Sequence, residues 1–70
     1  MENIIKINEL KSQLVMLKIG TISEDVEYSE KCSLKEKLTR DLIKTLEDES
    51  MNKERKEIVV KILETAIKSI

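Results

Sequence analysis

The fold is decided by residues 4–20, which read IIKINELKSQLVMLKIG. On a helical wheel of about 100° per residue, four of these residues form one seam with the spacing of a packed helix: Ile7, Leu10, Leu14 and Leu17. Three further apolar residues fall well away from that seam: Ile5, Met16 and Ile19. Ile4 and Val15 lie between the two groups. A surface helix usually has one apolar stripe, so we expect this helix, over 3–19, to be covered from more than one side.

The composition limits the kind of protein that the chain can form. Its 70 residues make one domain, over 1–70, near the size at which a single core is barely sufficient. The chain has no Phe, no Trp and one cysteine, so it lacks a disulfide that could add stability. Oligomerisation is the remaining common source of that stability, and we therefore expect a homodimer.

Charge and hydropathy exclude several locations and partners. The net charge is −1, which gives no electrostatic reason to bind nucleic acid or an anionic membrane. Charged residues such as Lys6 and Glu9 interrupt any signal peptide, and the longest apolar run, Leu14–Leu17, is too short to cross a bilayer. The lone Cys32 fits a reducing compartment. The abundance of Ile, Lys, Glu and Asn is typical of an AT-rich gene, so we predict a cytoplasmic, bacterial or phage protein.

The first turn predicts a helical hairpin. Gly20 suits the left-handed position that follows a helix end. Thr21 and Glu24 have the spacing of a capping box, with Thr21 as the N-cap of the second helix. A turn this short makes the first two helices antiparallel neighbours.

The second helix is expected over 22–47. A second capping-box match, Ser33 to Glu36, leaves open a break near Cys32, but we favour a continuous helix because the chain has no proline. The continuous form outruns the first helix by about nine residues, or roughly 13 Å. A monomer would leave that overhang poorly covered.

The third helix is expected over 52–69. Its wide apolar face consists of Ile58, Val59, Ile62, Leu63, Ala66, Ile67 and Ile70. The turn before it is rich in residues that prefer caps to helix interiors; Ser50 is the expected N-cap and Asn52 the alternative. The sequence therefore predicts an all-α, three-helix antiparallel bundle, a helical hairpin plus a third helix, completed by homodimerisation with the first helix near the centre.

Most catalytic chemistry is excluded by residue type. Histidine is absent, which removes the commonest general base and the imidazole metal ligands. A structural zinc site would need further cysteines, and one glycine cannot build a phosphate-binding loop. We therefore predict no enzymatic activity, no metal, no cofactor and no small-molecule substrate, and we interpret Cys32 as a small apolar core residue.

A basic face on the second helix supports an alternative function. Lys37, Arg40 and Lys44 share one face, as they would on a DNA-recognition helix. Acidic residues flank that face: Glu36, Asp41 and Glu47. A DNA-associated regulatory protein is therefore the alternative hypothesis, and nucleic acid is not the partner that we expect.

Surplus apolar surface is the remaining signal. The candidate interface consists of Ile5, Met16, Ile19, Ile22, Val26 and Tyr28. Scattered apolar residues are normal on a protein surface. We interpret this set instead as an interface, either with a copy of the same chain or with another protein, and tyrosine is enriched at binding hot spots. The predicted function is a small non-enzymatic protein–protein interaction module, a cytosolic regulator or adaptor that acts as a homodimer and binds another protein.

Overall fold

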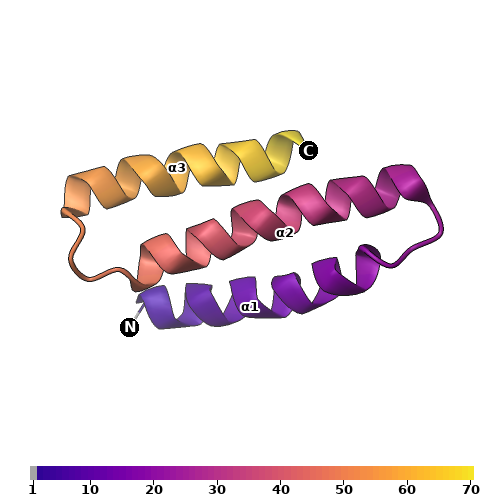
Figure 1. Ribbon diagram of the computed structural model, residues 1–70. Helices are drawn as coiled ribbons and strands as arrows, with labels where there is room; N and C mark the ends of the chain where they lie inside the picture. Colours follow the sequence, from indigo (N-terminus) through magenta and orange to yellow (C-terminus); the bar gives the residue numbers. More distant parts are fainter. Residues whose placement is uncertain (1) are drawn as a thin grey trace.

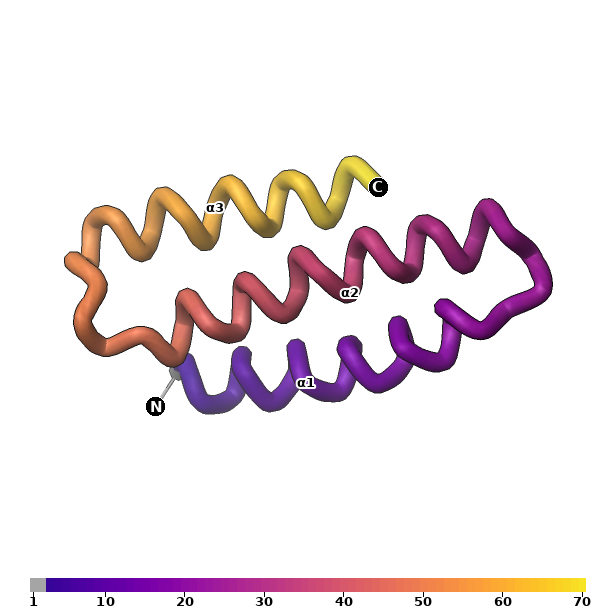
Figure 2. Tube along the Cα trace, viewed as in Figure 1, coloured from indigo at the N-terminus to yellow at the C-terminus, as the bar shows by residue number. Residues whose placement is uncertain are grey.

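Three helices make up the fold (Figure 1). The computed structural model describes residues 2–70, with side chains from residue 3 onward. The helices are α1 (Glu2–Gly20), α2 (Val26–Glu47) and α3 (Lys53–Ser69). Helix α1 packs on α2 and α2 packs on α3, so α2 is the middle helix of an antiparallel bundle (Figure 2). This arrangement confirms the predicted all-α architecture of a hairpin plus a third helix.

The core lies where the apolar stripes of the three helices converge. Its buried residues are Leu10 of α1 and Leu42, Ile43 and Leu46 of α2. Partly buried residues of the two outer helices pack against them: Ile7, Leu14, Val60, Leu63 and Ile67. The three- and four-residue spacing of these positions is what makes each segment helical and turns one stripe inward. None of the helices in residues 2–70 has the length and apolar character needed to cross a membrane.

Gly20 closes the hairpin by close packing. It is the last residue of α1, it is buried, and its φ angle is not positive. A Cβ atom at this position would overlap the sulfur of Cys32 and lie 3.3 Å from the ring edge of Tyr28. The predicted left-handed conformation is therefore wrong: glycine is needed here because α1 and α2 approach each other too closely for a side chain.

Helix α2 begins four residues later than the sequence predicts. The carboxylate of Asp25 accepts a hydrogen bond from the backbone N–H of Tyr28 at 3.2 Å, which makes Asp25 the N-cap. The hydroxyl of Thr21 donates to the carbonyl of Lys18 at 2.6 Å and so completes the end of α1. The predicted capping box of Thr21 and Glu24 is therefore wrong.

Helix α2 runs unbroken through Cys32 and Ser33, which confirms the continuous alternative. The expected nine-residue overhang of α2 over α1 is wrong. Because α2 starts late, it has 22 residues, and α1 has 19. The overhang lies elsewhere in the bundle. Figure 1 shows that the end of the α1–α2 hairpin extends beyond the C-terminal end of α3.

The turn before α3 is capped by Asn52. Its side-chain oxygen accepts hydrogen bonds from the backbone N–H groups of Glu54 at 2.8 Å and Arg55 at 3.4 Å. Ser50 instead donates its hydroxyl to the carboxylate of Asp48 at 2.6 Å. That hydrogen bond, and a second from the Ser50 backbone, lower the pKa of Asp48. The predicted Ser50 cap is thus wrong, and the Asn52 alternative is confirmed.

Loss of this cap should be measurable as a loss of stability. We expect Asn52→Ala to lower the free energy of unfolding by about 1 kcal/mol, because the first N–H groups of α3 lose their acceptor. Ser50→Ala is the matched control in the same turn, since its hydroxyl caps no helix. Chemical denaturation followed by circular dichroism measures both variants, and equal losses would contradict the cap assignment.

Candidate protein-interaction surface

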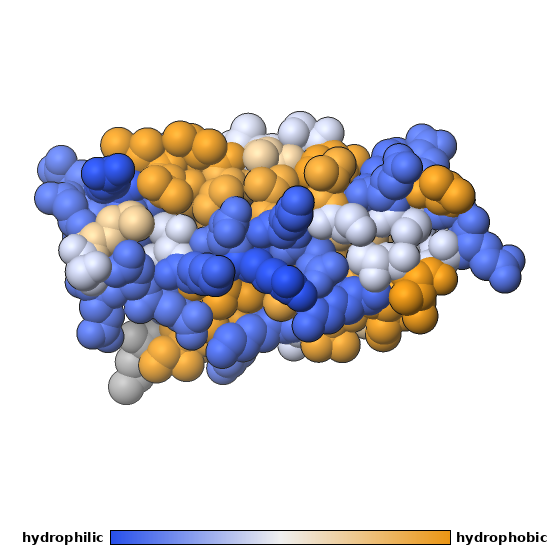
Figure 3. Space-filling view, in the orientation of Figure 1, coloured by the Kyte–Doolittle hydropathy of each residue, from blue (hydrophilic) through white to orange (hydrophobic). Residues whose placement is uncertain are grey.

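Many large apolar side chains of this bundle face outward. Among residues 3–70, eleven of them are more than half exposed, from 54% at Tyr28 and Leu34 to 82% at Ile22. Figure 3 shows hydrophobic surface gathered along two opposite margins, over α1 and over α3, with a hydrophilic band between them. Single exposed apolar residues are normal on a protein surface, whereas contiguous ones mark interaction sites. The distribution of the eleven along the helices is therefore informative.

One contiguous group lies on α1. The outer face of α1 consists of five exposed apolar residues and two exposed polar ones: Ile4, Ile5, Val15, Met16, Ile19, Asn8 and Ser12. They fill an arc of about 120° on the helical wheel, and no charged residue of α1 falls within it. Leu10 and Leu14, which pack in the core, lie on the opposite side of the helix. Helix α1 thus has two apolar faces, and the rest of the chain covers one of them.

Opposite charges border the outer face of α1. Lys11 and Lys18 follow one edge, and Glu9 lies at the other. The ammonium of Lys11 is 3.8 Å from the carboxylate of Glu47 on α2. This contact shows that the lysine edge is the one beside α2. The outer face itself therefore points away from the bundle.

The end of the hairpin carries three further exposed residues. Ile22 lies in the turn, where its N–H donates to the carbonyl of Ile19 at 3.3 Å, so it adjoins the outer face of α1. Val26 is the first residue of α2. Tyr28 lies one turn before Cys32, whose thiol raises the pKa of the tyrosine. The predicted interface residues are thus divided: Ile5, Met16 and Ile19 share the outer face of α1, Ile22 adjoins it, and Val26 and Tyr28 begin α2.

Sequence reasoning missed part of the exposed apolar surface. Ile4 and Val15 were not assigned to either face of α1, although the absence of charge across the whole arc would have placed them on the outer one. The α3 stripe, formed by Ile58 and Ile62, was also missed as an exposed surface. These two residues lie at the edge of an apolar face that is wider than α2 can cover.

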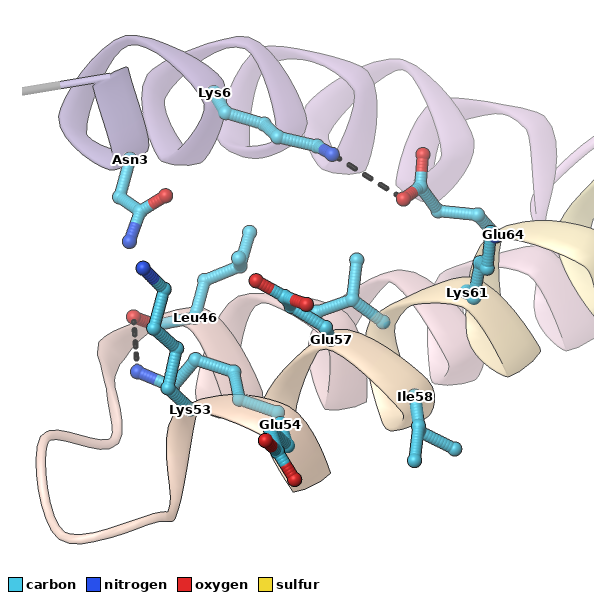
Figure 4. Close-up of a pocket in the computed structure, with 11 residues that line it drawn as sticks. Asn3, Lys6, Leu46, Lys53, Glu54, Glu57, Ile58, Lys61 and Glu64 are labelled. Carbon is cyan, nitrogen blue, oxygen red and sulfur yellow. Dashed lines mark hydrogen bonds and ion pairs between the residues drawn. The ribbon is translucent and has the colours of Figure 1, made fainter.

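A groove of about 1160 Å³ separates α1 from α3 (Figure 4). Leu46 and Val60 contribute to its lining, together with charged side chains of both signs. Lys6 reaches across from α1 to the carboxylate of Glu64 on α3, with an Nζ–Oε1 distance of 3.2 Å. This ion pair interrupts the apolar lining, so the groove offers no continuous strip for an apolar partner.

The basic residues of α2 lie among acidic ones. Lys37, Arg40 and Lys44 are all exposed. The guanidinium of Arg40 is 2.6 Å from the carboxylate of Glu36, and the exposed Asp41 follows on the same helix. These neighbours offset much of the positive charge that a phosphate backbone would contact.

Neither metal clusters nor relatives point to a function. Within the described part of the chain, no three cysteine, aspartate or glutamate side chains come close enough to hold a metal ion. The thiol of Cys32 is free and buried. Comparison with protein-family models, with curated proteins and with solved structures gives no match. The chemistry of the surface is therefore the basis for inferring what the protein does.

Proposed function

We propose that this chain is a small, non-enzymatic protein–protein interaction module that acts as a homodimer. The observation that carries the proposal is the outer face of α1, where five apolar side chains are 58–69% exposed and no charge intervenes. Fully burying one such side chain contributes roughly 1.5–3 kcal/mol, whereas the total stability expected of 70 residues is only about 4–10 kcal/mol. A second polypeptide on this face would add a substantial fraction of that stability.

Two separate apolar surfaces suit an adaptor or regulator. The outer face of α1 and the α3 stripe lie along opposite margins of the bundle, with a hydrophilic band between them (Figure 3). One surface can hold a second copy while the other receives a helix of a different protein. We therefore assign the chain a cytosolic regulatory or adaptor role, with the α3 stripe as the contact for that partner.

Size-exclusion chromatography with light scattering tests the proposal. At about 100 μM chain, we expect a mass of twice 8.1 kDa that falls toward the mass of one chain on dilution. Dilution should also increase the fluorescence per chain of a dye that binds exposed apolar surface, because the interface opens. A monomeric mass at every concentration would contradict the proposed homodimer, and the absence of dye binding as well would contradict an interaction surface of any kind.

A further inference from the structure

We propose that the second copy docks on the outer face of α1 with the two α1 helices parallel and in register, about a twofold axis that runs along them. The inference rests on the proposed homodimer and adds its interface and geometry. Two sets of outer-face residues repeat every seven positions: Ile5, Ser12 and Ile19, and Asn8 and Val15. A seven-residue repeat keeps one seam of a helix facing a parallel partner along its length.

The charged edges favour the parallel orientation. A twofold axis along α1 brings opposite edges together, so the edge with Lys11 and Lys18 lies beside the edge with the partner's Glu9. An axis perpendicular to α1 would make the helices antiparallel and bring each edge against its own equivalent. Lys11 would then face the partner's Lys11, which is unfavourable.

Asn8 gives the seam a register. Parallel pairing in register places the amides of Asn8 and the partner's Asn8 side by side, where each can both donate and accept a hydrogen bond. A shift of seven residues, which keeps the seam, would set an Asn8 amide beside the partner's Val15, without a hydrogen-bond partner. A single asparagine in the seam of a coiled coil is known to specify register in this way, at a cost in stability.

The area of the outer face limits the affinity. At about 100 Å² for a fully exposed aliphatic side chain, its five apolar residues expose roughly 300 Å² in each copy. Two copies together would bury roughly 600 Å² of apolar area. Since slightly more than half of a typical interface is apolar, the whole interface would bury about 1,100 Å². That value is at the lower end for a specific interface, so we expect micromolar dissociation.

Disulfide crosslinking tests the geometry directly. Ser12→Cys should place two thiols face to face across the axis, and mild oxidation at about 100 μM chain should link most chains into dimers. Gln13→Cys is the matched control, because Gln13 is also exposed but points about 100° away, toward a smaller hollow that Leu42 and Glu64 also line. We expect at least about tenfold less linked dimer from this control and none from the wild type, whose Cys32 is buried.

The possible outcomes separate the interface from the function on which it rests. A dimeric mass with no more linking for Ser12→Cys than for Gln13→Cys would overturn this interface and leave the homodimer standing. A monomeric mass would overturn both. An antiparallel seam would set Ser12 near the partner's Asn8, so a mixture of Asn8→Cys and Ser12→Cys chains that links better than either alone would overturn the parallel orientation. Circular dichroism of each variant verifies that it is folded.

Discussion

Replacing Leu42 with alanine is expected to lower the melting temperature by roughly 8–40 °C. Leu42 is 1% exposed and lies where all three helices meet. Truncation of a buried leucine costs about 2–5 kcal/mol, because the lost contacts leave a cavity. In a domain of this size, each kcal/mol shifts the melting temperature by about 4–8 °C. Thermal unfolding followed by circular dichroism measures the change.

Leu34→Ala is the matched control for this prediction. It makes the same chemical change on the same helix, but Leu34 is 54% exposed and lies outside the core cluster. We expect a loss below about 1 kcal/mol, or a few degrees. Both variants must be compared at one protein concentration, since the proposed dimer would make the melting temperature depend on concentration. Equal decreases in the melting temperature for Leu42→Ala and Leu34→Ala would contradict the assignment of Leu42 to the core.

The helices could be predicted from the sequence because their signal is long and repeated. In α1 the core seam recurs over about two turns, at Ile7, Leu10 and Leu14, so no single residue decides the assignment. The continuity of α2 through Cys32 and Ser33 follows from the same periodicity together with the absence of proline. Periodicity therefore outweighed the isolated Ser-x-x-Glu match.

The turns could not be predicted in detail, because each contains two residues capable of the same role. Thr21 and Asp25 are both good N-caps, and the choice between them depends on contacts made after the chain has reversed. Across that turn, the hydroxyl of Ser29 donates to the carbonyl of Thr21 at 2.6 Å, so Thr21 belongs to the junction with α1. Gly20 was misread for a similar reason: its close approach to Cys32 is a contact between helices, which a local sequence pattern does not contain.

The candidate surface was predicted in part. The wheel separates Ile5, Met16 and Ile19 from the core seam of α1, and the structure has all three exposed. The sequence could not say which face of α1 the third helix would leave open, since the apolar residues of α3 could in principle pack on either. In the folded chain, α3 packs on α2 and meets α1 beside the core, through the pair of Lys6 and Glu64. Because α3 packs on α2, the outer face of α1 stays uncovered.

A lysine in the outer face of α1 is expected to dissociate the proposed homodimer. For Ile19→Lys we expect the dissociation constant to rise at least about 100-fold, or roughly 3 kcal/mol. Two partly exposed isoleucines would no longer be buried, which accounts for about 1–2 kcal/mol each. Two lysines would also face each other across the axis, which adds repulsion. The monomer should remain folded, because a cation is favourable in the last turn of a helix.

Ile62→Lys is the matched control for this experiment. Ile19 and Ile62 are the same residue type with nearly equal exposure, 59% and 62%, but Ile62 lies on the α3 stripe. If the outer face of α1 holds the second copy, Ile62→Lys should leave the dissociation constant within about threefold of the wild type, because the two surfaces share no residue. Sedimentation equilibrium of the three proteins measures this difference. The reverse result, with Ile62→Lys monomeric and Ile19→Lys dimeric, would move the self-association surface to α3 and leave α1 as the face for another protein.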